Sequence, residues 1–152
     1  MSLKKIATQN VVTVSPETTV LEAAQRMREL HVGDVVVVKR DGAKKVPIGI
    51  LTDRDIVVST VALGVAPGAI AVEEVMLPIL VMAKITDNLY HVLNLMKEHG
   101  VRRVPLVNAA GLLEGVVSVE DITALLASEL ADVVKIKERQ HKIETERRKK
   151  LA

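Results

Sequence analysis

The spacing of hydrophobic residues in the first half of the chain alternates between a helical period and a strand period. After a short apolar lead-in at 6–14, helical spacing follows Thr18 and Thr19, either of which can cap a helix: Val20, Ala23, Ala24, Met27 and Leu30. Residues 35–38 are four consecutive valines, too short a run for a helix and strongly β-favouring, which predicts a buried strand. A turn at 41–42 and an apolar stretch at 48–51 predict a hairpin, and a helix is predicted from 52 to about 63.

The second half of the chain repeats this order of elements. The offset is 69 residues before the hairpin turn and 66 after it, because the first repeat has three extra residues between Gly42 and Gly49. Asp87 is the predicted cap of a second amphipathic helix, whose apolar residues are Leu89, Val92, Leu93 and Met96. Strands are predicted at 104–107 and 112–117 around a turn at 110–111, and a helix from 118 to about 127. Each repeat is therefore β-α-β-β-α.

One short motif closes both hairpins. Residues 49–55 read Gly-Ile-Leu-Thr-Asp-Arg-Asp, and residues 115–121 read Gly-Val-Val-Ser-Val-Glu-Asp. A hydroxyl residue followed three positions later by a carboxylate resembles a capping box, so a helix is predicted to start at each motif. The first turn of a helix carries unpaired N–H groups and a positive dipole end, which favour an anion such as phosphate.

The same motif offers groups for a ribose. Asp55 and Asp121 lie one turn into their helices, where a carboxylate can accept bonds from both vicinal hydroxyls, and Arg54 adds positive charge in the first copy. The alternative is that Thr52 and Ser118 are only helix caps and the aspartates only favourable first-turn charges. Duplication at equivalent places favours the binding interpretation.

Composition excludes several other functions. The 152 residues are nearly half apolar but include one tyrosine and no Phe or Trp, so base-stacking platforms for nucleic acid are absent. Without cysteine there are no disulfides, catalytic thiolates or thiolate zinc sites, which fits a reducing cytoplasm. The four histidines lack zinc spacing, so we expect no metal site. No Gly-x-x-x-x-Gly-Lys-[Ser/Thr], Gly-x-Gly-x-x-Gly or Gly-x-Ser-x-Gly motif occurs, and we expect no catalytic residues. The uncharged run 57–72 is too short and interrupted to span a bilayer, and no signal peptide is expected.

The positive charge is concentrated at the C-terminal end. The chain has 21 Lys or Arg against 19 Asp or Glu, and residues 129–152 carry eight of the former against five of the latter. Helix-forming residues predict a protruding helix that frays, and the apolar residues Leu130, Val133, Ile136 and Ile143 are too sparse to predict a sustained heptad seam. Nucleic acid is a candidate partner only through this basic tail.

The duplicated motifs, their order, and the segment Val-Arg-Arg-Val-Pro-Leu-Val at 101–107 resemble a tandem pair of cystathionine-β-synthase (CBS) domains. The resemblance implies an α+β fold in which two repeats pack through their sheets as one pseudo-two-fold module. It predicts a first CBS repeat at 1–67, a second at 68–127 and a charged helical tail at 128–152. In that family the two clefts bind AMP, ADP, ATP or S-adenosylmethionine, and the modules are usually regulatory rather than enzymatic.

The resemblance also assigns roles to residues. Asp55 and Asp121 look like the ribose ligands. The residues expected at the phosphates are Thr52, Arg54, Ser118, Arg102 and Arg103. The residues expected around the adenine are Val12, Val14, Gly33, Val35, Val36, Ile50, Val81, Ala83, Val104, Pro105 and Val116. The first repeat has Gly33-Asp34 where the second has Arg102-Arg103, so we expect the two clefts to differ in charge.

The sequence therefore predicts a cytoplasmic regulatory module with an adenine nucleotide as ligand, no cofactor and no membrane contact. A homodimer is expected, because the amphipathic helices leave Val57, Val61, Leu125 and Leu126 needing cover. A competing hypothesis is an interaction protein with empty clefts that acts through its basic tail, on a protein or on nucleic acid.

Overall fold

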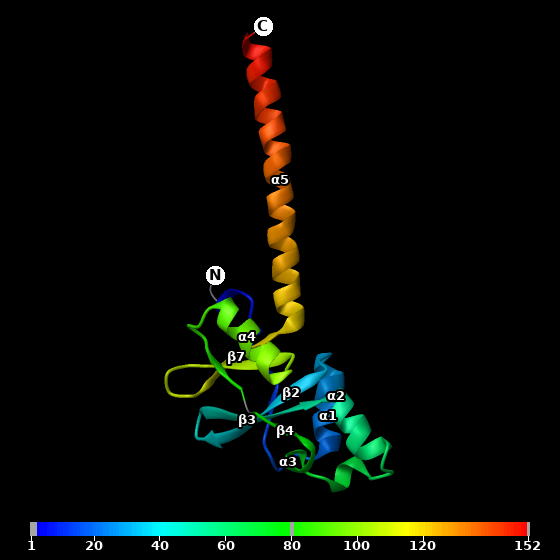
Figure 1. Ribbon diagram of the computed structural model, residues 1–152. Coiled ribbons are helices and arrows are strands. Elements are labelled where there is room, and N and C mark those ends of the chain that lie inside the picture. Colours follow the sequence, from blue (N-terminus) through cyan, green and yellow to red (C-terminus); the bar gives the residue numbers. More distant parts are fainter. Residues whose placement is uncertain (1–2, 80, 152) are drawn as a thin grey trace. The chain divides into compact units, whose positions relative to one another are not determined.

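The computed structural model describes residues 3–79 and 81–151 and divides the chain into two compact units, Met1–Val117 and Ser118–Ala152 (Figure 1). The first unit is a mixed α+β structure with two small sheets, one in the order β1-β2-β3-β4 and one in the order β5-β6-β7. Its first repeat contains η1 (Leu3–Lys5), β1 (Thr13–Val14), α1 (Val20–Leu30), β2 (Asp34–Asp41), β3 (Lys44–Thr52), α2 (Asp53–Ile56) and η2 (Val57–Val61). Its second repeat contains η3 (Pro67–Ala69), α3 (Val72–Val75), β4 (Leu77–Pro78), β5 (Ala83–Lys84), α4 (Leu89–His99), β6 (Arg103–Val107) and β7 (Leu113–Ser118).

Helix α1 begins with the cap that the sequence predicts at 18–19. The Thr19 hydroxyl accepts a bond from the Glu22 amide (3.2 Å), and the Glu22 carboxylate accepts one from the Thr19 amide (2.9 Å). Bonds from the Thr19 backbone and then its hydroxyl hold the pKa of Glu22 below its ordinary value of 4.5. The cap is therefore fully effective above that value and is lost as the pH falls through the lowered pKa.

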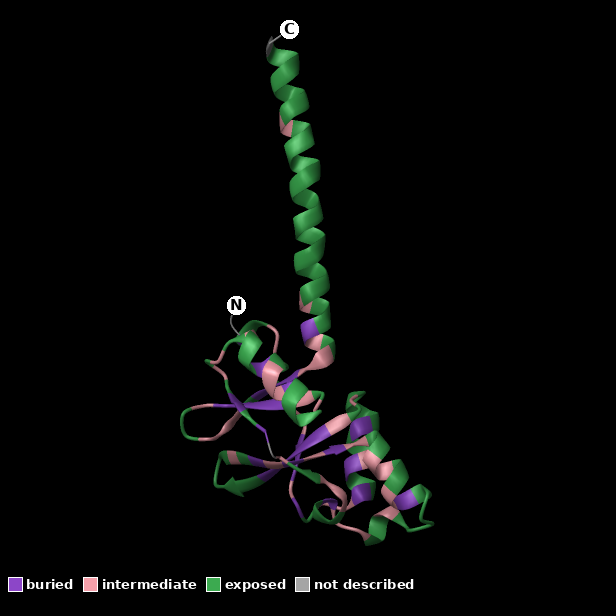
Figure 2. Ribbon diagram, viewed as in Figure 1, coloured by how far each residue is buried: buried purple, intermediate pink, exposed green. Residues whose placement is uncertain are grey.

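Strand β2 is buried on both faces, which explains its run of four valines. Val35 and Val37 pack toward α1, in a cluster that includes Ala23 and Met27. Val36 and Val38 point the other way and pack with Val116 of the second repeat. Successive side chains of a strand alternate between faces, so only an uninterrupted apolar run can serve both cores. In Figure 2 the buried residues gather on these strands and on the inner sides of the helices.

The two repeats exchange their lead-in segments. Strand β4, at the start of the second repeat, pairs with β3 of the first, with Leu77 opposite Ile50. In return Thr8 forms an antiparallel bridge with Val116, with N–H···O distances of 2.9 and 3.0 Å. The offset of 69 residues carries Thr8 onto Leu77, and the offset of 66 carries Ile50 onto Val116. The exchange therefore obeys the pseudo-two-fold symmetry that the repeats predict.

The glycine that opens each motif makes room for this exchange. A Cβ atom on Gly115 would lie 3.1 Å from the Thr8 carbonyl oxygen, and one on Gly49 would lie 3.2 Å from the Leu77 carbonyl oxygen and overlap the Met76 side chain. Both contacts involve the backbone of the exchanged segment, which cannot move without breaking its pairing. The motif glycines are therefore packing residues.

Gly115→Val should destabilise the first unit by about 1–3 kcal/mol, the usual cost of overpacking, although valine favours a strand. Gly68→Val is the matched control, because Gly68 is exposed and its Cβ would meet only the Leu21 side chain, at 3.6 Å. Urea unfolding measures both. Equal free energies of unfolding for the two variants would contradict the packing role of Gly115.

The second repeat departs from prediction at one cap. Asp87 was the expected cap of α4, but the N-cap is Asn88, whose side-chain oxygen accepts a bond from the His91 amide (2.9 Å). Asp87 instead accepts a bond from the Lys84 amide (2.8 Å) and closes the turn that precedes the helix. Both residue types suit either role, so composition alone does not separate them.

The helix predicted from 52 to about 63 is regular only over α2. It continues as the π-helical segment η2, which carries the β-branched run Val57, Val58 and Val61. The buried Thr60 hydroxyl bonds the Ile56 carbonyl oxygen at 2.6 Å, and a hydroxyl bonded four residues back often bends a helix.

The second unit is built on one helix, α5 (Val119–Leu151), which follows the final residue of β7. The helix predicted at 118–127 and the charged tail predicted beyond it are one continuous element, drawn from yellow to red in Figure 1. Between 129 and 150 every side chain is exposed except Ile143, which is half-buried. The predicted boundaries at 67 and 127 stay predictions, and the ends of the predicted segments at 1–2 and 152 lie outside the described residues.

Candidate ligand-binding site

The first motif forms a complete capping box at the start of α2. The Asp55 Oδ2 atom accepts bonds from the Thr52 amide (2.9 Å) and the Thr52 hydroxyl (2.7 Å), and the Thr52 oxygen accepts one from the Asp55 amide (3.2 Å). Both residues are half-buried. All the carboxylate bonds of the box go to Oδ2, so Oδ1 lies outside the box.

The second motif, in the second unit, has the same geometry. The Asp121 Oδ2 atom accepts bonds from the Ser118 amide (2.8 Å) and the Ser118 hydroxyl (2.6 Å), and the Ser118 oxygen accepts one from the Asp121 amide (3.1 Å). Ser118 and Asp121 are also half-buried. The two motifs are thus locally equivalent, as their sequences predict.

A capping box alone does not identify a ligand site. Thr19 and Glu22 form the same pattern at the start of α1, where nothing in the sequence indicates binding. That box is exposed, whereas the boxes of the two motifs are partly buried. The alternative that the motifs are only caps therefore remains consistent with their hydrogen bonds, and the distinction must come from their surroundings.

The residues expected around the adenine divide between the two faces of the sheet. Val14 and Val35 pack in the helix-facing core, so only their backbone is available to a ligand on the opposite face. Val36 and Val116 lie together on that opposite face, and the half-buried Ile50 pairs with Val36. The remaining expected residues are half-buried at Val12, exposed at Gly33 and buried at Val81, Ala83, Val104 and Pro105.

Some backbone groups near the first motif are already hydrogen-bonded. The Gly33 carbonyl oxygen accepts a bond from the Asp53 amide (3.0 Å), and the Val12 carbonyl oxygen accepts one from the Val36 amide (3.0 Å). The first bond ties the start of β2 to the start of α2. Both bonds bring the segments at Val12, Gly33 and Thr52 toward one end of the sheet, as a shared site requires.

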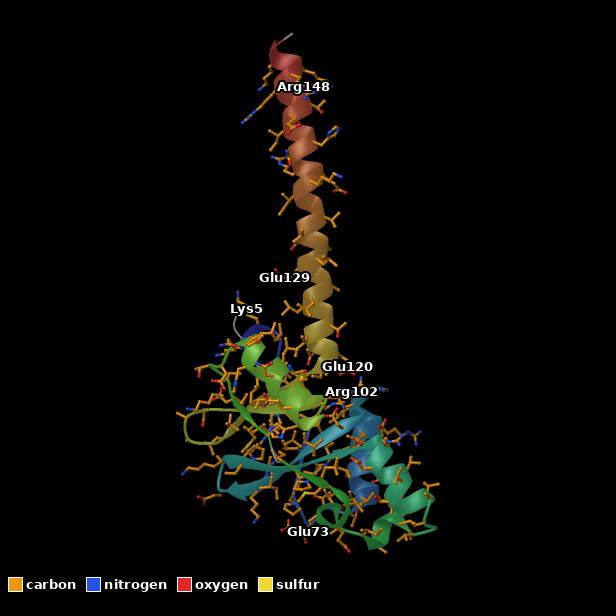
Figure 3. All side chains as sticks on the ribbon, viewed as in Figure 1. Lys5, Glu73, Arg102, Glu120, Glu129 and Arg148 are labelled. Carbon is orange, nitrogen blue, oxygen red and sulfur yellow. The ribbon has the colours of Figure 1, made fainter. Side chains whose placement is uncertain are left out.

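An ion pair links the positions at which the repeats differ most. The Arg103 Nε atom lies 2.9 Å from Asp34 Oδ1, and both side chains are partly exposed. The offset of 69 residues carries Asp34 onto Arg103, so each residue pairs with its own counterpart in the other repeat. The sequence analysis treated Asp34 only as a source of different charge in the two clefts, although opposite charges at equivalent positions of the two repeats could have suggested an ion pair. Arg54 and Arg102 are exposed, and Figure 3 labels Arg102.

Asp34→Asn should strengthen AMP binding if Arg103 contacts phosphate, because the guanidinium would no longer be neutralised. The expected gain is up to about fivefold, since a partly exposed ion pair contributes about 0.2–1 kcal/mol. Asp41→Asn is the control, with the same charge change at the other end of β2. Isothermal titration distinguishes them. Unchanged affinity in Asp34→Asn would remove Arg103 from the phosphate site.

A separate groove of about 630 Å³ lies along the edge strand β1. Its lining combines polar, basic and apolar residues from β1, α1 and the hairpin: Gln9, Asn10, Val11, Val12, Thr13, Arg26, Leu30, Val32, Arg40 and Lys45. Neither Thr52 nor Asp55 contributes to it, and Val12 is its single member from the predicted set. The sequence analysis did not select the three basic residues, because they do not recur between the repeats.

Within residues 3–79 and 81–151, no group of three His, Asp or Glu side chains is arranged to hold a metal ion. No helix in the same ranges is long and apolar enough to cross a membrane.

Comparison with known proteins agrees with the fold and the repeats. The family model of the CBS domain matches twice, at residues 3–60 and 72–128. The CBS domain-containing protein YhcV of Bacillus subtilis is 39% identical over 121 residues, which cover 80% of this chain and 82% of that protein. An uncharacterized protein of Methanopyrus kandleri is 34% identical over 122 residues, but this chain spans 61% of its length.

Two solved structures show the same architecture. Hypoxic Response Protein I with two coordinated zinc ions is 31% identical with a TM-score of 0.69, over 82% of this chain and 98% of that one. The CBS domain protein PAE2072 of Pyrobaculum aerophilum, complexed with AMP, is 25% identical with a TM-score of 0.70, over 80% and 89%. The chain belongs to the CBS domain family and carries two CBS domains in tandem.

Proposed function

We propose that this protein is a regulatory module that binds an adenosine nucleotide through its two Gly-x-x-[Ser/Thr]-x-x-Asp motifs. The observation that carries the proposal is their local equivalence: each places a half-buried carboxylate one turn into a helix, beside a hydroxyl, at the same place in its repeat. The AMP complex of PAE2072, a protein of the same fold, supports this class of ligand.

Each motif supplies two kinds of contact in the proposed complex. The Oδ1 atom of Asp55 accepts bonds from the ribose hydroxyls while Oδ2 retains the cap, so binding does not disrupt the start of α2. The Thr52 hydroxyl and the positive end of the helix face the phosphate. Asp121 and Ser118 act in the same way in the second motif. Because these groups can hold and orient a ligand, the proposed role is regulatory.

The two clefts differ less in charge than the sequence alone predicts. Asp34 of the first repeat pairs with Arg103 of the second. Arg103 therefore adds less positive charge to the second repeat than its sequence alone suggests. The repeats also differ at the preceding position, where Gly33 stands in the first and Arg102 in the second, and this difference in sequence is the reason to expect unequal ligand affinities.

A thermal-shift panel with AMP, ATP and S-adenosylmethionine tests the function. A ligand that binds only the native state raises the melting temperature, by an amount that grows with its concentration above Kd. We expect a concentration-dependent increase with at least one of the three and none with inorganic phosphate. If none of the three raises the melting temperature and the protein instead shifts the mobility of nucleic acid on a native gel, the alternative is favoured, in which the protein binds through the basic end of α5.

We also propose that the module is a homodimer that covers apolar side chains left exposed in the first unit. Val57 is 53% exposed and Val61 is 73% exposed on η2, whereas in the second unit Leu125 is half-buried and Leu126 is 53% exposed. Val61→Asp should shift the mass measured by light scattering from dimer to monomer at micromolar concentration. Ser59→Asp, two residues before Val61, is the control for added charge. A monomeric wild-type chain would contradict the proposal.

A further inference from the structure

Helix α5 displays apolar side chains that stay exposed in the single chain. Leu126, Leu130, Val133 and Ile136 are 53–67% exposed, and Figure 2 shows the helix green along most of its length. Exposed apolar residues at this density on one helix are unusual for a solvated tail, because burying them against a partner is favourable.

The continuous helix fixes a heptad register for these residues. Core positions recur at alternating spacings of three and four: Leu126, Glu129, Val133, Ile136, Gln140 and Ile143. Arg147 and Lys150 take the next two core positions and end the seam, which is therefore short rather than sustained. The two polar members, Glu129 and Gln140, decide how two copies of the helix can face each other.

Glu129 disfavours a parallel pair in register. In that orientation each core residue faces its own copy, so two Glu129 carboxylates would share one layer of the seam. They would repel each other, and neither would gain a hydrogen-bond donor. The flanking charges do not decide between the orientations, because opposite charges meet in both.

One antiparallel register matches the core residues by character. In that register Leu126 faces Ile143, Val133 faces Ile136, and Glu129 faces Gln140, and each layer occurs twice by symmetry. Apolar residues then meet apolar residues, and an amide donor meets a carboxylate. Gln140 donates to Glu144 in the single chain (2.9 Å), but its amide carries a second N–H for Glu129 of the other helix.

The flanking residues fit the same antiparallel register. Asp132 lies beside Arg139 of the other helix, twice by symmetry, and Leu130 lies beside the aliphatic stem of Lys137. Asp132 also bonds Lys135 of its own helix (2.7 Å), but both of these side chains are well exposed. A carboxylate accepts several bonds, so the two contacts of Asp132 are compatible.

The neighbouring antiparallel registers bring like charges together. A shift of one heptad in one direction sets Arg139 against its own copy and Leu126 against Lys150. A shift in the other direction sets Asp132 against its own copy and Glu129 against Val133. Of the three antiparallel registers, the one that pairs Leu126 with Ile143 therefore satisfies both the core and the flanks.

We propose that α5 pairs with α5 of a second copy of this chain as a short antiparallel coiled coil over residues 126–143. The pairing is independent of nucleotide binding and separate from the contact proposed at Val57 and Val61. The seam spans fewer than three heptads, so the pair is weak on its own. Disulfide cross-linking accumulates such a pair, whereas light scattering at micromolar concentration does not depend on it.

Single-cysteine variants of the full chain test the contact and its orientation, because the chain contains no cysteine. A disulfide requires Cα atoms within about 7 Å. Residues 126 and 143 are about 25 Å apart along one helix, at 1.5 Å per residue. Under mild oxidation we expect no dimer from Leu126→Cys or Ile143→Cys alone, and a cross-linked dimer on a denaturing gel when the two are mixed.

A mixture of Ala131→Cys and Glu138→Cys is the matched control. These two residues lie at the same level of the proposed pair but on the outer faces of the helices, so their mixture should remain mostly monomeric. Cross-linking of each seam variant alone, without a mixed product, would show a parallel pair and overturn the proposal. Equal yields from the seam and control mixtures, or no product from the seam mixture, would overturn the pairing itself.

A charge swap tests the register separately. Arg139→Asp, introduced into both seam variants, sets like charges beside each other twice and should lower mixed cross-linking several-fold. Adding Asp132→Arg restores opposite charges and should restore the yield, whereas in a parallel pair the same two changes would set like charges opposite Lys137 and Glu144. Far-UV circular dichroism of each variant checks that the helix is retained. If the double swap cross-links as weakly as Arg139→Asp alone, Asp132 and Arg139 do not meet and the register is wrong.

Discussion

Asp55→Ala and Asp121→Ala should each weaken AMP binding at one cleft at least tenfold and leave the fold intact. Each carboxylate is held by its capping box with Oδ1 outside the box, and we propose that this oxygen accepts bonds from a ribose. A charge-assisted hydrogen bond contributes about 1.5–3 kcal/mol, and 1.4 kcal/mol is tenfold in affinity. The two losses should be unequal, since Arg102 has Gly33 as its counterpart. Isothermal titration of both variants with AMP measures them.

Glu22→Ala is the matched control for these variants. It removes a carboxylate from the same kind of capping box on α1. A capping charge contributes about 0.3–1 kcal/mol to stability, so all three variants should lower the melting temperature slightly. Only the aspartate variants should lose AMP affinity. If all three bind AMP like the wild type, Asp55 and Asp121 are helix caps and the ribose role is wrong.

Leu51→Ala should lower the free energy of unfolding by about 2–5 kcal/mol. Leu51 is fully buried in the cluster beneath α1, directly before Thr52, so its loss leaves a cavity beside the first motif. Native proteins are stable by only about 5–15 kcal/mol, so this single change removes a large share. Urea unfolding followed by far-UV circular dichroism measures it.

Val46→Ala on the same strand provides the comparison. Val46 is 40% exposed on β3, and its truncation should change stability by less than about 1 kcal/mol. The Leu51 variant should also bind AMP more weakly than the wild type under conditions in which both are fully folded, since Leu51 directly precedes the Thr52 cap. If Leu51→Ala and Val46→Ala have similar unfolding midpoints, Leu51 does not stabilise the core as predicted.

Local signals predicted much of the fold. The Thr19 cap, the valine run of β2 and the two hairpins follow from period, propensity and turn residues, and the structure confirms each of them. The repeat offsets also predicted the symmetry, which the structure shows as the exchange of Thr8 and Leu77 between repeats. The duplicated motif made these predictions stronger, because the same order of elements is predicted independently in each repeat.

Contacts between distant segments could not be predicted in the same way. The sequence places Gly49 and Gly115 in strands but gives no reason for a glycine there. The reason is the backbone of the exchanged segments at Leu77 and Thr8, which leaves no room for a side chain. Asp34 and Arg103 form an ion pair across the symmetry axis, a contact that depends on how the sheets meet. The π-helical segment η2 contains a buried Thr60 hydroxyl bonded to the Ile56 carbonyl oxygen, a contact that the spacing of hydrophobic residues does not predict.

Native mass spectrometry of the full chain with added AMP tests the central claim most directly. The account predicts that the wild type carries up to two AMP molecules per chain, that each single aspartate variant loses one, and that the double variant Asp55→Ala/Asp121→Ala retains none. Glu22→Ala should match the wild type. AMP adducts of equal number on the wild type and the folded double variant would contradict the assignment of the ligand to the two motifs.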